Sequence, residues 1–139
     1  MSSILFSVNS LNELQKVADK IYQLSFSKRI FLLNGEMGSG KTTLIKYIVS
    51  HFGIKEANSP TFSIINTYLD NNGQSIYHVD CYRIENENEI ENIGLLEILN
   101  SESLCFIEWP EKIHNFLPNN CVSININVEE DLRKIVIKT

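Results

Sequence analysis

The chain has 139 residues, of which 43% are hydrophobic and 21% charged, and this composition is typical of one globular domain spanning residues 1–139. Its 12 basic and 17 acidic residues give a net charge of −5, which argues against a protein that holds nucleic acid by itself, because phosphates demand a basic face. No apolar run approaches the roughly 20 residues that cross a bilayer, and the N-terminus lacks a signal-peptide pattern, so we expect a cytoplasmic protein without a membrane segment.

The first third of the chain alternates strand-like and helical patterns. Residues 4–8 predict a strand, and the capping-box pattern at residues 10–13 opens a helix that ends near Leu24. Residues 29–34 form a short apolar run, which is typical of a buried strand. The chain therefore begins with the order strand, helix, strand, helix. This order predicts a sheet with helices on both faces.

The segment after this second strand carries the most informative motif. Residues 35–42 read G-E-M-G-S-G-K-T and fit the P-loop pattern G-x-x-x-x-G-K-[ST] at every specified position. Its glycines let backbone N–H groups surround a phosphate at the N-terminus of a helix, where anions are favoured. In this pattern Lys41 reaches the β- and γ-phosphates of a nucleotide, and the Thr42 hydroxyl binds Mg²⁺. The predicted nucleotide-binding residues of this segment are Gly35, Glu36, Met37, Gly38, Ser39, Gly40, Lys41, Thr42 and Thr43.

The middle of the chain predicts a hairpin and then helical structure. Residues 62–69 and 75–80 are strand-like and are joined by a turn that contains Asn-Gly, a strong hairpin signal. A short acidic stretch at 85–91 precedes a helical pattern at 93–99, which is broken at Gly94.

The last part of the chain predicts three more strands. Residues 104–108 form an apolar strand that ends on a carboxylate, and 110–116 a short helix with proline in its first turn. Residues 122–128 and 133–138 predict two closing strands around a polar turn. The whole pattern predicts an α/β fold, a P-loop NTPase-like sandwich whose central mixed, largely parallel sheet is flanked by helices and an antiparallel hairpin.

Two acidic residues stand where a P-loop site requires a carboxylate near the metal. Asp80 and Glu108 each end a predicted strand, and ligands of open α/β sheets bind at the carboxyl ends of the strands. Glu108 follows an apolar strand, as in a Walker B element. We predict catalytic and metal-binding roles for both, although each pattern taken alone also fits a solvated acid at a strand end.

A candidate switch segment follows the P-loop helix. Residues 58–62, Asn-Ser-Pro-Thr-Phe, occupy the place of the segment that contacts the γ-phosphate and Mg²⁺ in GTPases. Thr61 is the residue that would make this contact, whereas the local sequence by itself favours a plain Ser-Pro turn. No [NT]-K-x-D motif is present, so guanine specificity is not indicated.

The remaining reactive side chains are few. Among the arginines only Arg83 is expected near the site, as an arginine finger or a salt-bridge partner, and the arginine-rich lid of small phosphotransfer kinases is missing. The cysteines Cys81, Cys105 and Cys121 are odd in number and widely spaced. We therefore expect free, buried thiols rather than disulfides or a zinc site.

Several blocks of the sequence resemble, in order and spacing, the bacterial TsaE (formerly YjeE) family. They are G-E-M-G-S-G-K-T-T at 35–43, S-P-T-F at 59–62, H-V-D-C-Y-R at 78–83, I-G-L-L-E at 93–97 and I-E-W-P-E at 107–111. The resemblance covers nearly the whole chain, and the second and last blocks are far more specific than the P-loop alone. Departures are mild: the family usually has Asp at Glu36, often Leu at Met37 and often Arg near Lys46, and none removes a phosphate or metal ligand.

The resemblance implies a small ATPase that is needed to make threonylcarbamoyladenosine in tRNA. Proteins of this family act with the TsaB–TsaD pair and support its turnover, rather than transferring the carbamoyl group themselves. They meet tRNA only through that complex. The resemblance also implies that ATP is the nucleotide and that Thr61 belongs to a switch-like loop.

Roles for the site residues follow from the same resemblance. It implies that Lys41 and Thr42 bind phosphate and Mg²⁺. It also implies that Asp80 and Glu108 are essential acids near the metal. Trp109 is expected to be a positioned, nucleotide-binding residue, although a core or lid tryptophan fits the sequence equally well.

We therefore predict a Mg²⁺-dependent ATPase whose catalytic residues are Lys41, Asp80 and Glu108 and whose intrinsic rate is low without partners. Asp80 is expected on the metal side and Glu108 at the attacking water or in the outer shell, with the reverse division left open. The alternatives are a nucleotide-gated adaptor with negligible catalysis and a small-molecule kinase. The oligomeric state stays open, with a monomer as one expectation.

Overall fold

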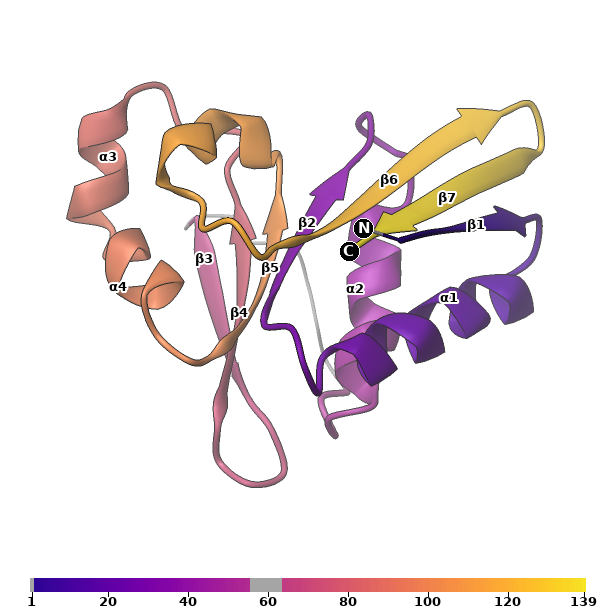
Figure 1. Cartoon of the computed structure of the whole chain (residues 1–139), viewed down its shortest axis with the longest axis horizontal. Helices are drawn as coiled ribbons and strands as arrows, with labels where there is room; N and C mark the ends of the chain where they lie inside the picture. Colours follow the sequence, from indigo (N-terminus) through magenta and orange to yellow (C-terminus); the bar gives the residue numbers. More distant parts are fainter. Residues whose placement is uncertain (1, 56–63) are drawn as a thin grey trace.

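The computed structural model describes residues 2–55 and 64–139 (Figure 1). Within them, one sheet has the strand order β1-β7-β6-β2-β5-β4-β3. The strands are β1 Ser3–Val8, β2 Ile30–Asn34, β3 Ile65–Leu69, β4 Ser75–Asp80, β5 Leu104–Glu108, β6 Val122–Glu129 and β7 Leu132–Lys138. The helices are α1 Leu11–Leu24, α2 Lys41–Ser50, α3 Glu87–Asn92, α4 Leu95–Leu99 and the 3₁₀ segment η1 Pro110–Phe116.

The centre of the sheet is parallel and its two edges are antiparallel. Strands β4, β5, β2 and β6 lie side by side in parallel register. Strand β3 pairs antiparallel with β4, and β7 and β1 extend the other edge antiparallel. The predicted mixed, largely parallel α/β sheet and its β3–β4 hairpin are confirmed. Because parallel strands end at the same edge, the residues that follow β2, β4 and β5 come together there.

Helices cover both faces of the sheet (Figure 1). On one face α1 and α2 enclose a core that includes Ile21, Leu44 and Phe106. On the other face α3, α4 and η1 enclose a second core, which includes Leu95 and Ile107. Consecutive residues of a strand point to opposite faces, so Phe106 and Ile107 belong to different cores. The apolar run of β5 is therefore explained by burial on both faces.

Local capping signals set the helix boundaries. The Ser10 hydroxyl caps α1 by accepting a backbone hydrogen bond, as its sequence pattern predicts. The acidic stretch before the predicted second helical segment is itself helical from Glu87, a helix that the sequence interpretation missed. Asn86 and Glu89 form a reciprocal capping box at its start. Gly94, with a φ of 77°, separates α3 from α4, as predicted.

The described cysteines are free thiols, as expected. Cys81 and Cys105 are buried, and Cys121 is half-buried. Burial, aided by the Asp80 carboxylate, raises the pKa of the Cys81 thiol to about 12, so this thiol stays protonated at neutral pH and is a poor nucleophile. Among the helices in the described ranges, none is long and apolar enough to cross a membrane.

Candidate functional site

The P-loop joins β2 to α2 through glycines in the left-handed region. Gly38 and Gly40 have φ values of 80° and 108°, which side chains with a Cβ rarely adopt. At Gly35 a Cβ would lie 2.6 Å from the Ser39 hydroxyl oxygen, so a side chain there would clash. The loop thus turns sharply into α2, whose first N–H groups have no partner inside the helix. This geometry favours an anion.

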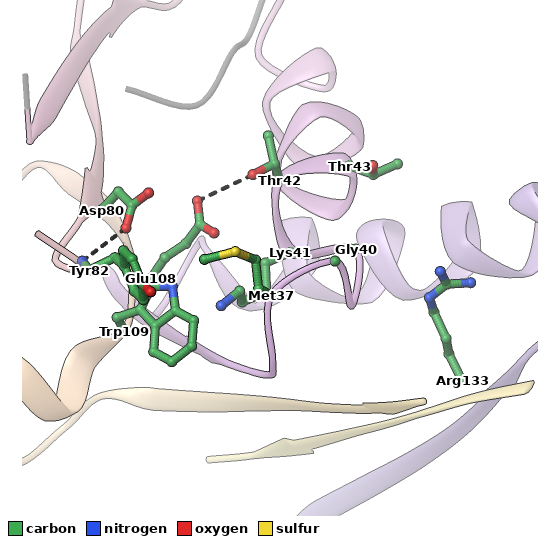
Figure 2. Close-up of a pocket in the computed structure, with 11 residues that line it drawn as sticks. Met37, Gly40, Lys41, Thr42, Thr43, Asp80, Tyr82, Glu108, Trp109 and Arg133 are labelled. Carbon is green, nitrogen blue, oxygen red and sulfur yellow. Dashed lines mark hydrogen bonds between the residues drawn. The ribbon is translucent and has the colours of Figure 1, made fainter. Parts of the chain in front are cut away.

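A cavity of about 380 Å³ opens beside the loop (Figure 2). It is lined by Met37, Gly38, Gly40, Lys41, Thr42, Thr43, Asp80, Tyr82, Glu108, Trp109 and Arg133. These residues come from the P-loop and α2, from the ends of β4 and β5, and from β7. The structure therefore brings the predicted lysine, the predicted threonines Thr42 and Thr43, and both predicted acids to one cavity.

Lys41 lines this cavity, and its ammonium contacts the Gly35 carbonyl and the Trp109 ring. The residue is 5% exposed, its Nζ donates a hydrogen bond of 2.7 Å to the Gly35 carbonyl, and Nζ lies 3.8 Å from the centroid of the Trp109 ring. Burial lowers the pKa of Lys41, while the carboxylates of Glu108, Asp80 and Glu111 oppose that change. A nearby phosphate would compensate the buried charge further.

The two acids face Lys41 from neighbouring parallel strands. Asp80 and Glu108 are directly paired in the register of β4 and β5. Asp80 Oδ1 accepts a hydrogen bond of 3.0 Å from the Tyr82 backbone N–H. Glu108 is 4% exposed, and its Oε2 accepts a hydrogen bond of 3.4 Å from the Thr42 hydroxyl, drawn as a dashed line in Figure 2. A cation between the P-loop and these carboxylates would have oxygen donors on both sides.

The donor set fits Mg²⁺ held together with a nucleotide. The described residues contain no cluster of three or more histidine, cysteine or carboxylate ligands. An ion here would be held by the Thr42 hydroxyl, by a carboxylate and by phosphate oxygens of the nucleotide, which is how Mg²⁺ is usually bound at phosphate sites. Donors that are all oxygen also match the preference of Mg²⁺.

Trp109 lines the cavity beside Lys41. Its φ of 56° and ψ of 52° place a residue with a bulky side chain in the left-handed region, where unusual backbone often marks a functional site. The indole lies over Lys41 and packs at a ring-centroid distance of 5.0 Å from Tyr82. Trp109 is therefore placed at the cavity, packed against the P-loop lysine.

The other predicted residues lie around the cavity or outside the described ranges. Gly35 supplies the carbonyl that binds Lys41. Glu36 and Ser39 line neighbouring hollows instead of this cavity. Thr61 lies outside the described residues, so its role in a switch stays a prediction.

Arg133 lines the cavity, although it was not among the residues predicted there from the sequence. Arg83 was the only arginine expected near the site, but Arg83 does not line the cavity and Arg133 does. The Arg133 Nε–H donates a hydrogen bond of 2.8 Å to the carbonyl of Ser39 in the P-loop. Figure 2 shows its guanidinium on the far side of the loop from the two acids. The register of β7 with β1 and β6 places Arg133 there. This register cannot be read from the residues that flank Arg133 in the sequence.

A second cavity of about 300 Å³ adjoins the first. Gly40, Thr43 and Arg133 line both cavities, so the two spaces meet along the P-loop. The walls of the second one combine apolar side chains such as Leu14 with polar ones such as Asn9. Apolar walls with a few polar groups are typical of small-molecule sites.

Known proteins are similar in sequence to most of the chain. Residues 8–135 match the family described as "Threonylcarbamoyl adenosine biosynthesis protein TsaE". A tRNA threonylcarbamoyladenosine biosynthesis protein TsaE from Haemophilus influenzae is 36% identical over 123 residues, covering 87% of this chain and 77% of that protein. The protein of the same name from Borreliella burgdorferi is 41% identical over 100 residues, covering 71% and 72%.

The fold is shared as well. The crystal structure of YdiB from Bacillus subtilis superposes with a TM-score of 0.74 at 28% identity, covering 98% of this chain and 84% of that one. The chain belongs to the TsaE family, which takes part in the biosynthesis of threonylcarbamoyladenosine in tRNA.

Proposed function

We propose that this protein is a Mg²⁺-dependent ATPase that acts with the TsaB–TsaD pair in tRNA modification. It supports the turnover of that pair and does not transfer the carbamoyl group itself. The observation that carries the proposal is the cavity where the P-loop lysine faces carboxylates from two neighbouring strands. The net charge of −5 fits contact with tRNA through partners instead of through a basic face of this chain.

The P-loop is proposed to hold the phosphates. Backbone N–H groups of the loop and of the first turn of α2 surround the β-phosphate. In the free protein the Lys41 ammonium donates a hydrogen bond of 2.7 Å to the Gly35 carbonyl. When the nucleotide binds, the ammonium donates to oxygens of the β- and γ-phosphates instead. There it stabilises the charge that develops on the leaving oxygens.

Asp80 and Glu108 are proposed to have different roles, one at the metal and one at the attacking water. When bound, Mg²⁺ neutralises phosphate charge and stabilises the transition state. Its protein ligands would be Thr42 and Asp80, while the more deeply buried Glu108 orients the attacking water. The water oxygen bonds to the γ-phosphorus as the bond to the bridging oxygen of ADP breaks, and the proton of the water passes to Glu108 or to the released phosphate.

The nucleoside is proposed to occupy the second cavity. The phosphate chain runs along the loop towards Thr43, and Thr43 lines both spaces. The base would then lie against Leu14 with its polar edge near Asn9 and Ser10. Inorganic tripolyphosphate, which lacks the nucleoside, is therefore expected to bind more weakly than ATP.

Phosphate release tests the proposed activity. We expect slow release from Mg·ATP by the chain alone, strong stimulation by an added TsaB–TsaD pair, and neither effect in Lys41→Ala. Slow intrinsic turnover is the norm when a partner completes a P-loop site. Fast release that does not depend on the partner pair would instead indicate a self-contained ATPase, or a kinase that leaks to water.

Arg133→Ala is expected to weaken the binding of Mg·ATP about tenfold or more, because a hydrogen bond from a charged donor contributes ~1.5–3 kcal/mol. The variant loses the guanidinium that holds the Ser39 carbonyl at 2.8 Å. Titration calorimetry measures the change. Lys134→Ala is the matched control, since Lys134 is the next residue on β7 and pairs with Glu129 on the surface. Equal affinities in the two variants would refute a role for Arg133 in the loop.

A further inference from the structure

His78 lies on β4 behind the cavity and contacts one of the proposed catalytic acids. Its side chain is 1% exposed, and its Nε2 lies 2.6 Å from Oε2 of Glu108. We assign the imidazole hydrogen to Nε2, because a carboxylate that faces a ring nitrogen at this distance acts as the acceptor. A buried donor this close to an anion forms a strong, short hydrogen bond.

The strand register explains why these residues meet. Asp80 pairs with Glu108, and His78 pairs with Phe106. Alternate residues of a strand share one face, so His78 and Asp80 project on the same side of β4. The side chain of Glu108 emerges from β5 on that side, the side of α2. There Thr42 donates to the same oxygen, Oε2, that His78 contacts. A hydrogen-bonded chain thus connects the P-loop helix, β5 and β4.

The imidazole has no second polar partner in the described part of the chain. Its Nδ1 is buried and makes no hydrogen bond there. Buried polar groups are normally paired, and an exception often signals a functional role. Among the described residues, Glu108 is therefore the hydrogen-bond partner of the His78 imidazole. Both hydrogen bonds that the described residues make to the carboxylate fall on Oε2. Oε1 therefore has no donor among these residues, and Glu108 lines the cavity.

We propose that His78 is a positioning residue for ATP hydrolysis. It holds the Glu108 carboxylate in the orientation that presents Oε1 to the attacking water, and it does not touch the nucleotide itself. This inference rests on the proposed ATPase activity and adds a residue that neither the cavity lining nor the P-loop pattern includes.

Kinetics of variants at this position test the proposal. His78→Leu fills a similar volume without a donor, and we expect kcat to fall about 10- to 100-fold, as for other residues that orient a ligating or catalytic group. The KM for Mg·ATP should stay within about threefold, because ground-state binding is untouched. His78→Gln retains an N–H donor at a similar reach and should recover most of kcat. Ile76→Val, a buried change on the same face of β4, is the control for packing and should leave kcat unchanged.

A double-mutant cycle separates positioning from general damage. If His78 acts through Glu108, His78→Leu should lower kcat no further in a Glu108→Gln background. Additive losses, a wild-type kcat in His78→Leu, or equal defects in His78→Leu and His78→Gln would each overturn the proposal. Melting temperatures of all variants show whether a loss of kcat accompanies unfolding.

A spectroscopic measurement keeps the inference testable apart from catalysis. Nuclear magnetic resonance of isotope-labelled histidine should show a solvent-protected imidazole proton on His78 in the wild-type chain. That proton should shift upfield in Glu108→Gln, because a neutral amide oxygen accepts a weaker hydrogen bond than a carboxylate does. Absence of the proton, or no shift, would overturn the contact. A wild-type chain that shows the proton yet releases no phosphate with its partners would overturn the ATPase proposal and leave the contact established.

Discussion

Replacing Lys41 with alanine is expected to weaken the binding of Mg·ATP by about two orders of magnitude, because charge-assisted hydrogen bonds contribute ~1.5–3 kcal/mol each and the lysine would contact two phosphates. Phosphate release should fall to background, with and without partners. Titration calorimetry and a phosphate-release assay measure the two effects. Lys46→Ala is the matched control, since Lys46 lies one turn later on α2 with an exposed side chain.

The same substitution should leave the fold intact. Burial lowers the pKa of Lys41, so the charged form costs folding free energy at any pH below its folded pKa. Removing the charge at neutral pH is therefore expected to leave the melting temperature unchanged or raised. A large drop in melting temperature would show that Lys41 is needed for structure, and the loss of binding would then carry no information about phosphates.

Replacing Glu108 with glutamine is expected to preserve nucleotide binding and lower kcat by about 100-fold or more, the usual contribution of a group that handles a proton in the transition state. The amide has nearly the same shape and keeps an acceptor for the donors on Thr42 and His78, but it lacks the negative charge. Single-turnover kinetics combined with calorimetry separate the two effects. The control is Glu111→Gln, because the exposed Glu111 carboxylate influences Lys41 without lining the cavity.

Loss of binding in Glu108→Gln would reverse the proposed roles, with Glu108 on the metal and Asp80 at the water. The variant also distinguishes an ATPase from a nucleotide-gated adaptor. If a chain that binds but does not hydrolyse ATP still supports repeated rounds of tRNA modification, the bound state alone matters and hydrolysis is dispensable. If modification stops after one round, turnover depends on hydrolysis.

Much of the site could be predicted because its signals are local. The P-loop needs glycines at fixed offsets between a strand and a helix, and each requirement can be read from adjacent residues. Asp80 and Glu108 were predictable for a related reason: each ends an apolar strand, and parallel strands end at one edge of a sheet. Their pairing in the structure follows once β4 and β5 are neighbours.

The missed residues depend on long-range register instead. Arg133 reaches the P-loop because β7 lies beside β6, which in turn lies beside β2. Arg133 pairs with Val8 of β1 and Val128 of β6, and this register places Arg133 level with the P-loop. His78 meets Glu108 because β4 and β5 are in a particular alignment, and a shift of one residue would turn it to the opposite face. Neither relation leaves a pattern in a single sequence.

The contact between Trp109 and Lys41 has a practical consequence. The chain contains a single tryptophan, and its ring lies 3.8 Å from the ammonium that is proposed to bind phosphate. Excitation at the red edge of protein absorption avoids the tyrosines, so all of the emitted light would originate at the cavity. When phosphate binds, the Lys41 ammonium is proposed to move away from the indole. This movement would change the local electric field, which determines the wavelength and intensity of the tryptophan emission. The molecule therefore carries an intrinsic optical probe of its own site, and occupancy can be followed without a label.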